Sequence, residues 1–178
     1  MPRNVEVKAR LRDRAGVEAR ALALATAPAQ DLQQDDSFFR CAEGRLKLRR
    51  FADGSAELIA YSRADAEGPK TSTYVRTPVA DAEGLRAALA AACGLVGRVR
   101  KQRRLVMIGR TRVHLDRVEG LGDFMELEVV LRDGEPECDG ADEAEALLTR
   151  LGVAPADLVQ GAYLDLLASS ASGSGFGG

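Results

Sequence analysis

The sequence predicts an α+β domain built mainly from antiparallel strands, and three observations support this fold class. Segments in which polar and apolar residues alternate, as they do in half-buried strands, recur along the chain. Turn signals such as Glu43-Gly44 and Asp53-Gly54 separate several of these segments, and such short connections favour antiparallel pairing. Alanine-rich stretches read as helices, and 178 residues are enough for one domain with a sizeable core.

The first half of the chain is expected to hold one helix and a series of strands. The helix is predicted over residues 14–27, because Asp13 suits an N-cap and Pro28 cannot continue a helix. The strands are predicted at residues 3–11, 31–41, 44–50, 56–63 and 71–76.

The second half is expected to hold three helices and three strands. The strands are predicted at residues 98–108, 111–118 and 124–131. The helices are predicted at residues 81–92, 142–151 and 154–167, and Gly94 suits the end of the first of them. One domain is expected over residues 1–168, followed by a disordered Gly/Ser-rich tail at 169–178.

Composition excludes several classes of protein. With 25 Lys+Arg against 27 Asp+Glu, the net charge of −2 offers no basic field for nucleic acid. The sequence has no apolar run near the ~20 residues of a membrane helix, and it begins without a secretory signal. Its three cysteines lie far apart, without the spacing of metal ligands. We therefore expect a cytoplasmic protein that binds neither nucleic acid nor membrane, with neither a disulfide framework nor a zinc knuckle.

One face of several predicted strands is almost purely ionic, and its sign differs between strands. The basic rows are Arg45, Lys47 and Arg49, and Lys101 and Arg103; the acidic row is Glu126 and Glu128. A solvated sheet face is one interpretation, since antiparallel sheets often face water on one side. The other is a closed barrel with the charges inside, where a polyanion and a divalent cation neutralise both sets.

The chemistry of these rows favours a site for a metal ion and phosphates. Carboxylates are oxygen ligands for Mg²⁺ or Mn²⁺, and Mg²⁺ commonly joins one or two of them to substrate phosphates. Arg and Lys bind the remaining phosphate oxygens, with Arg able to do so through two hydrogen bonds. The sequence lacks a Walker-type loop, so the phosphates would not be held by a P-loop.

An ordered series of motifs resembles the CYTH family, which unites class IV adenylyl cyclases, thiamine triphosphatases and related triphosphate tunnel metalloenzymes. Asn4-x-Glu6-x-Lys8 matches two of the three positions of the family's Glu-x-Glu-x-Lys signature. Further matches are QDDSFF at 34–39, GRLKLR at 44–49, LIAYSRAD at 58–65, GPKTSTY at 68–74, VRKQR at 99–103, HLDRVEGLGDFMELE at 114–128 and GAYLDLL at 161–167. The GPKTSTY and LDRVEGLGDF elements look closest to the class IV cyclase branch.

The resemblance implies an eight-stranded antiparallel β-barrel, open as a triphosphate tunnel, with flanking helices. It implies that the metal is held by Glu6, Glu126, Glu128 and Asp116. It implies that the phosphates are bound by Lys8, Lys47, Arg49, Arg63, Lys70, Lys101 and Arg103. Glu6, Lys8, Arg63 and Asp116 are the residues it implies for catalysis.

The resemblance also implies an enzyme that uses Mg²⁺ or Mn²⁺ and acts on a triphosphate such as ATP, thiamine triphosphate or tripolyphosphate, as a monomer or homodimer. Cyclisation of ATP to cyclic AMP and pyrophosphate, and hydrolysis with release of phosphate, both fit such a tunnel. The alternative is a polyphosphate- or nucleotide-binding module with little or no turnover, which Asn4 supports because an amide carries no charge. His114, the sole histidine, is interpreted as structural.

Overall fold

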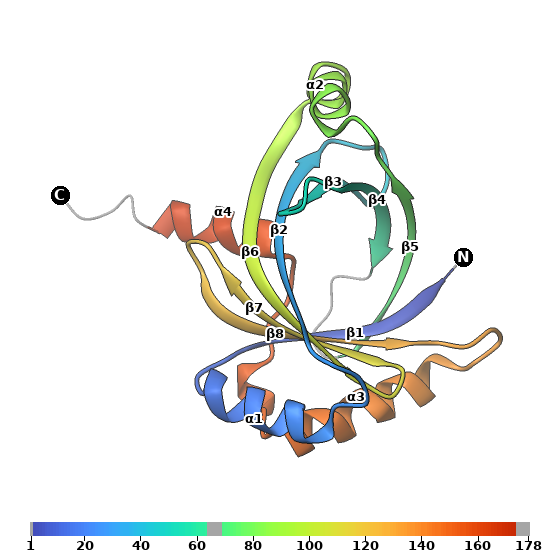
Figure 1. Cartoon of the computed structure of the whole chain (residues 1–178), viewed down its shortest axis with the longest axis vertical. Helices are drawn as coiled ribbons and strands as arrows, with labels where there is room; N and C mark the ends of the chain where they lie inside the picture. The colour runs from blue at the N-terminus through green and yellow to red at the C-terminus, as the bar shows by residue number, and fades with distance from the viewer. Residues whose placement is uncertain (1, 64–68, 174–178) are drawn as a thin grey trace.

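The computed structural model describes residues 2–63 and 69–173, with side chains described for 2–62 and 69–171. Within these residues eight antiparallel strands close into a barrel in the order β1-β5-β4-β3-β2-β6-β7-β8 (Figure 1). The strands are β1 Arg3–Arg10, β2 Gln30–Phe39, β3 Arg45–Phe51, β4 Ala56–Arg63, β5 Lys70–Pro78, β6 Leu95–Ile108, β7 Thr111–Val118 and β8 Gly122–Val130. The predicted α+β class and the eight-stranded barrel are confirmed.

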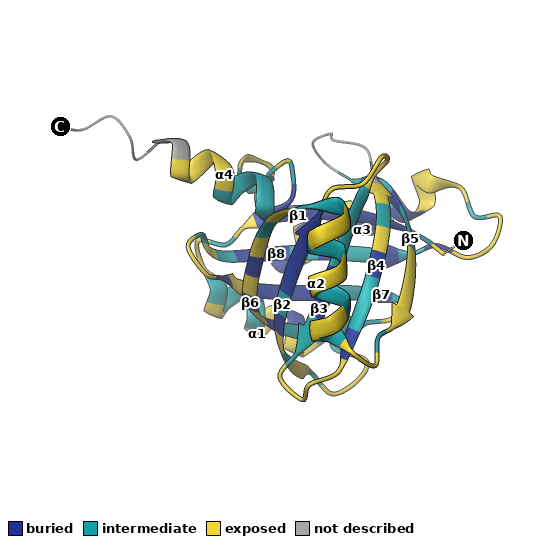
Figure 2. Ribbon diagram, turned by 90° about the horizontal axis from the view of Figure 1, so that it is seen from above, coloured by how far each residue is buried: buried dark blue, intermediate teal, exposed yellow. Residues whose placement is uncertain are grey.

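Helices flank the barrel. They are α1 Arg14–Leu24, α2 Ala82–Cys93, α3 Glu137–Leu151 and α4 Tyr163–Gly173, with a 3₁₀ turn η1 at Pro155–Asp157. Figure 1 shows α1 and α3 side by side at one end of the view and α2 at the other, and α2 lies across β2 and β3 in Figure 2. No helix among the described residues combines the length and the apolar character needed to cross a membrane.

The aliphatic residues of β1 and β3 face outwards, towards these helices. Val5 and Val7 of β1 are 1% and 2% exposed and pack in a cluster with residues of α1 and α3. Leu48 of β3 packs with residues of α2. Because successive side chains of a strand point to opposite faces, the charged residues between these apolar ones face the lumen. Figure 2 shows the resulting buried bands along β1 and β8.

Strand β1 closes the barrel, since it pairs with β5 on one edge and with β8 on the other. This double pairing sets the register of the charged residues. Glu6 stands opposite Lys70 of β5 and opposite Glu128 of β8, and Lys8 stands opposite Glu126. Five charged positions of the predicted site thus fall into two neighbouring rows.

The predicted ends of two helices need correction. Helix α1 ends at Leu24 rather than at residue 27, because Ala25 has extended backbone and the Thr26 amide donates to the Met107 carbonyl of β6. Its N-cap is as expected, since Asp13 accepts from the Gly16 amide. Helix α3 begins at Glu137 rather than at residue 142, directly after Pro136, and its first turn carries acidic residues that favour a helix N-terminus.

The predicted helix over residues 154–167 is wrong in its first half. Leu158 forms a bridge with Ala9, and the Val159 amide donates to the Lys8 carbonyl, so this segment runs extended beside β1. Gly161 has a φ of 81°, a conformation that interrupts a helix and that glycine adopts without strain. Helix α4 therefore begins only at Tyr163.

Helix α4 continues to Gly173, five residues into the predicted tail. The Ser169 and Ser170 hydroxyls donate to the carbonyls of Asp165 and Leu167, so the serines are compatible with the helix here. The disordered tail predicted from residue 169 therefore does not begin there, and residues 174–178 lie outside the described residues.

Candidate active site in the barrel lumen

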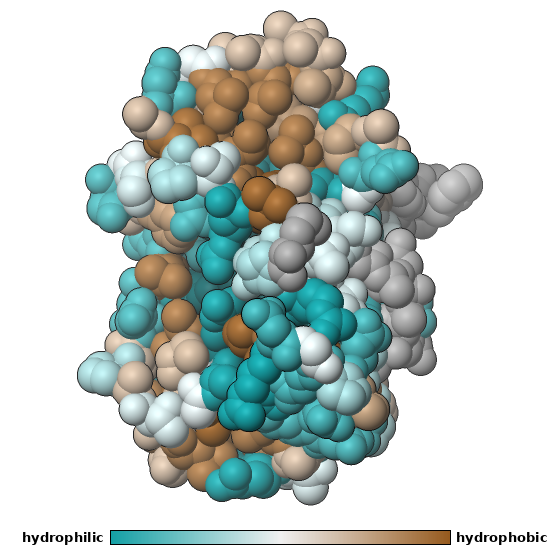
Figure 3. Space-filling view, turned by 90° about the vertical axis from the view of Figure 1, so that its right-hand side faces the viewer, coloured by the Kyte–Doolittle hydropathy of each residue, from teal (hydrophilic) through white to brown (hydrophobic). Residues whose placement is uncertain are grey.

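The ionic faces of the strands enclose a cavity of about 260 Å³. All eight strands contribute to its wall, and Ala162 and Tyr163 add to it from the segment that leads into α4. Figure 3 shows hydrophilic residues gathered across the middle of one face of the molecule, around a hollow. Of the two interpretations of the ionic rows, the structure therefore selects the enclosed lumen over the open, solvated sheet.

On one side of the lumen, three cations surround the buried carboxylate of Asp36. Arg49 donates to both Asp36 oxygens at 2.7 Å, and Lys47 Nζ donates to Oδ2 at 3.0 Å. Lys101 Nζ lies 3.8 Å from the same oxygen. Burial alone would raise the pKa of Asp36, but Arg49 and Lys47 hold it well below its usual value. Three cationic groups thus share one anion.

The excess of positive charge around Asp36 affects the pKa values of its two lysines. Burial, together with the neighbouring guanidinium of Arg49, lowers the pKa of Lys47 to about 8. Burial and the charge of Arg103 lower the pKa of Lys101 well below its usual value. A lysine whose charge is disfavoured in this way gains from a further anion nearby. The cluster is therefore suited to bind a polyanion.

Arg103 is held by a second buried acid, Asp116. The two side chains make a paired contact, with distances of 2.7 and 2.6 Å from Nε and a terminal nitrogen to the two carboxylate oxygens. The Tyr163 hydroxyl donates to Asp116 Oδ2 at 2.8 Å. Asp116 is fully buried and is not part of the cavity wall. Its carboxylate therefore orients Arg103.

Tyr163 lies beside two lysines at the start of α4. Lys8 Nζ is 4.3 Å and Lys101 Nζ is 5.2 Å from the centre of its ring, within cation–π range. Lys8 Nζ also donates to the Gly161 carbonyl at 3.1 Å and lies 3.4 Å from Glu126 Oε2. The segment before α4 therefore fixes the position of the signature lysine.

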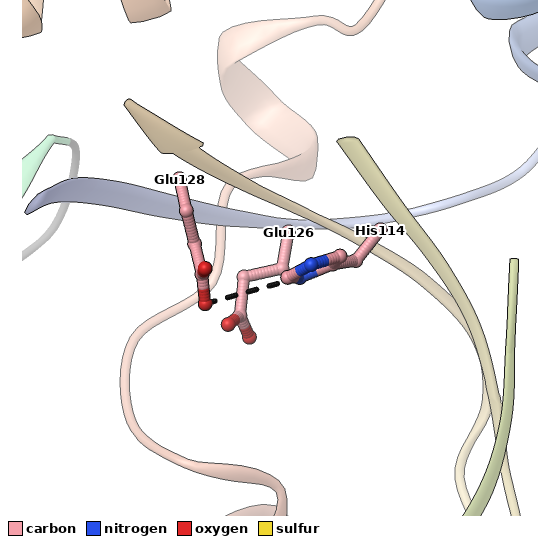
Figure 4. A group of neighbouring side chains, drawn as sticks. All are labelled: His114, Glu126 and Glu128. Carbon is pink, nitrogen blue, oxygen red and sulfur yellow. Dashed lines mark ion pairs between the residues drawn. The ribbon is translucent and has the colours of Figure 1, made fainter. Parts of the chain in front are cut away.

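Glu126 and Glu128 of β8 and His114 of β7 form a compact group on the acidic side of the lumen (Figure 4). A ligand atom of each lies within 4.8 Å of those of the other two. His114 Nδ1 is 3.8 Å from Glu128 Oε1, and Arg112 donates to Glu128 Oε2 at 3.2 Å. Burial, reinforced by Arg103, lowers the pKa of His114 to about 4, so its imidazole is neutral at neutral pH.

These residues fit a divalent cation. Glu6 and Glu128 stand directly opposite each other on β1 and β8, so a divalent cation between them would offset the repulsion of like charges. The buried atoms Asn4 Oδ1 and His114 Nδ1 have no hydrogen-bond partner among the described residues. Carboxylate oxygens, an amide oxygen and a neutral imidazole are all ligands of divalent metals.

Eight of the predicted site residues meet at the cavity: Glu6, Lys8, Lys47, Arg49, Lys101, Arg103, Glu126 and Glu128. Two others do not: Lys70 is buried opposite Glu6 but is not part of the cavity wall, and Asp116 lies behind Arg103. The Arg63 side chain lies outside the described residues.

Sequence reasoning missed several residues of the lumen, chiefly Asp36, Arg112, His114 and Tyr163. A signal existed for two of them, because Arg112 and His114 alternate with aliphatic residues along β7, in the pattern used for the other strands. Asp36 had no such signal, because the residues on either side of it in β2, Asp35 and Ser37, are polar. Tyr163 had no such signal, because it reaches the lumen from a helix and not from a strand of the barrel.

Comparisons with known proteins agree with this architecture. The model of the CYTH domain matches residues 2–163. The chain is 29% identical to the adenylate cyclase CyaB of Aeromonas hydrophila, over 93% of this chain and 89% of that protein.

Solved structures share the fold. A protein of Pyrococcus horikoshii OT3 has a TM-score of 0.81 at 22% identity and covers 92% of this chain and 99% of its own. A Hippeastrum protein with a dominant triphosphatase activity has a TM-score of 0.66 at 17% identity, covering 96% of each chain. Since the family model spans nearly all of the barrel and its helices, the chain belongs to the CYTH family.

Proposed function

We propose that this protein is a divalent-metal-dependent enzyme that binds a triphosphate in the barrel lumen and cleaves one of its phosphoanhydride bonds. One observation carries the proposal. Cations from β1, β3 and β6 line the same cavity as the carboxylates of β8. This arrangement matches a metal-bound triphosphate, which presents negative oxygens to the cations and a positive ion to the carboxylates.

The phosphate oxygens are bound mainly by Arg49 and Arg103. Each guanidinium is held in place by a buried carboxylate, Asp36 or Asp116, and such fixed donors need little rearrangement when charge develops on the leaving phosphates. Lys8, Lys47 and Lys101 add positive charge around the same cavity. Positioning and neutralisation of charge thus suffice, without a covalent nucleophile.

Glu6, Glu126 and Glu128 would hold the metal ion. When bound, the ion lowers the pKa of an attacking oxygen and draws charge from the phosphoryl group. These residues bring the acidic side of the lumen next to Lys8, which lies 3.4 Å from Glu126. The bond to be broken would therefore lie between the carboxylates and the cationic cluster around Asp36.

Two reactions fit the same cavity. In hydrolysis, water attacks the terminal phosphorus, and orthophosphate and a diphosphate leave. In cyclisation, the ribose 3′-hydroxyl of ATP attacks the α-phosphorus, and pyrophosphate leaves. The curated adenylate cyclase relative favours the second reaction, and Tyr61 and Tyr74, paired across β4 and β5 in the cavity wall, offer aromatic surface to a base.

Product analysis tests the proposal. The protein is incubated with ATP, thiamine triphosphate or tripolyphosphate plus Mg²⁺ or Mn²⁺, and cyclic AMP, pyrophosphate and orthophosphate are measured. Cyclic AMP identifies a cyclase, and orthophosphate a triphosphatase. Binding without any product identifies the module with no turnover.

Glu126→Gln should abolish the metal-dependent turnover while the fold, followed by circular dichroism, stays intact. Glu145→Gln is the matched control, because Glu145 lies exposed on α3 outside the lumen. Equal activity of the wild type and Glu126→Gln would contradict the assignment of the acidic side.

A further inference from the structure

The sole histidine of the sequence lies in the lumen and faces two carboxylates. His114 comes from β7 and is 4% exposed, whereas Glu126 and Glu128 come from the neighbouring β8 (Figure 4). His114 stands directly opposite Glu126 in the pairing of the two strands. The register of the barrel therefore places the ring in the acidic group.

One nitrogen of this ring, Nδ1, needs a partner that the described residues do not supply. His114 Nδ1 is buried and makes no hydrogen bond to the described residues. The neighbouring carboxylate oxygen, Glu128 Oε1, is 3.8 Å away, which is too long for a hydrogen bond. A buried polar atom without a partner costs about 1–3 kcal/mol, so a group bridging nitrogen and oxygen would remove a penalty.

Each of the two glutamates is contacted by a cation from a neighbouring strand. Arg112 donates to Oε2 of Glu128, which leaves Oε1 on the side of His114. Lys8 lies 3.4 Å from Oε2 of Glu126. Such outer contacts orient the ligands of a metal and are a regular part of metal sites in proteins.

We propose that His114 is a metal ligand together with Glu126 and Glu128, and that its nitrogen makes the lumen prefer Mn²⁺ and the heavier first-row dications over Mg²⁺. Imidazole suits first-row transition metals, whereas Mg²⁺ selects sites made of oxygen atoms alone. The proposal rests on the proposed function, which places a metal ion in the same lumen. The inference adds a nitrogen ligand to the oxygen ligands of Glu6, Glu126 and Glu128.

Because the chain has one histidine, its ring can be observed directly. Mn²⁺ is added to the full chain, free of any histidine tag, and pulsed electron paramagnetic resonance measures the coupling of ¹⁴N to the bound ion. We expect a directly bound imidazole nitrogen in the wild type. The coupling should vanish in His114→Gln and persist in Arg117→Gln, which alters an exposed side chain of the same strand.

Affinities give a second, independent readout. Titration calorimetry with Mn²⁺ and with Mg²⁺ is carried out on the wild type and on His114→Asp, which replaces the nitrogen ligand by oxygen. Changes to groups that merely support a metal ligand cost about 10–100-fold in affinity. We therefore expect the ratio of Mn²⁺ to Mg²⁺ affinity to fall at least about tenfold in His114→Asp, with Mg²⁺ affinity maintained or increased.

The outcomes separate this inference from the proposed function. Turnover of a triphosphate by a protein whose bound Mn²⁺ shows no nitrogen coupling overturns the inference and leaves the function in place. Nitrogen coupling without turnover of any triphosphate supports the inference and overturns the proposed function. An unchanged affinity ratio in His114→Asp, or no binding of Mn²⁺ with or without tripolyphosphate, also overturns the inference.

Discussion

Asp36 organises the cationic side of the lumen. It is 1% exposed and compensates Arg49, Lys47 and Lys101 at once. Breaking a buried ion pair by removing one partner typically costs about 3–5 kcal/mol, because the remaining charge stays buried and unpaired. Asp36→Asn should therefore lower the free energy of unfolding by about that amount, as measured by urea titration.

The neighbouring Asp35→Asn is a matched control for this prediction. Asp35 pairs with Arg98 and Arg50 nearer the surface, where ion pairs contribute about 1 kcal/mol or less. Tripolyphosphate should restore part of the stability lost in Asp36→Asn, since it supplies negative charge to the same cations. Equal losses in the two variants would contradict the role given to Asp36.

Lys47 makes binding and stability depend on pH in opposite directions. Its pKa is about 8 in the folded protein, against 10.5 as the ordinary value. Between these two values the unfolded chain binds more protons than the folded one, so Lys47 contributes stability that rises with pH. Tripolyphosphate affinity should instead fall as the pH rises above about 8, because the ammonium is lost.

Calorimetry across pH 7 to 10 measures this fall. The control is Lys47→Arg, which keeps its charge over the whole range and should show a shallower decline. The same slope in the wild type and Lys47→Arg would assign the dependence to other groups.

Asn4 stands where the family signature has a glutamate, and its Oδ1 is buried without a hydrogen-bond partner among the described residues. Asn4→Glu should increase Mn²⁺ affinity, because a carboxylate on this strand adds a charged ligand on the side of Glu6. Without metal the same variant should unfold at a lower temperature, since another carboxylate enters a crowded acidic group. Asn4→Gln, which adds length without charge, should raise neither the affinity nor the metal-induced stabilisation.

The strands were predictable because each carries its own signal, whereas the last helix was not. In β1 and β8 the alternation of charged and aliphatic residues identified both the strand and the face that lines the lumen. The stretch before α4 has helical composition, but pairing of Leu158 with Ala9 on β1 overrides that local preference. This long-range contact positions Tyr163, whose hydroxyl donates to the buried Asp116. No local sequence pattern predicts such a contact.

Helix α3 packs closely on the barrel through Gly140. A Cβ atom at this position would lie 2.7 Å from Leu131 Cδ2 and 2.9 Å from Val5 Cγ2. Gly140→Ala gains about 1 kcal/mol of helix propensity, but overpacking of a core typically costs about 1–3 kcal/mol. We expect a net loss in thermal unfolding, with metal affinity unchanged because Gly140 lies outside the lumen. A more stable variant would contradict the close packing.

At the scale of the molecule, the lumen holds a group of cations around Asp36 and a group of carboxylates on β8. A triphosphate with its metal ion would neutralise both groups. A ligand that binds only the folded state at 100 times its dissociation constant adds about 2.7 kcal/mol of stability. For a domain of this size, 1 kcal/mol corresponds to roughly 2–4 °C in the melting temperature. Tripolyphosphate with Mn²⁺ should therefore raise the melting temperature by roughly 5–11 °C, more than either component alone, as scanning calorimetry would show.

Because β1 pairs with both β5 and β8, the barrel cannot close during synthesis until β8 has left the ribosome. One of its neighbours, β8, ends at Val130, about 120 residues after Arg10, which at about 5–20 residues per second is roughly 6–24 s of translation. Until then Val5 and Val7 lack α3 as well, because that helix follows β8 in the chain. Until β8 is made, β1 therefore lacks its partner on one edge, and unpaired strand edges are templates for aggregation.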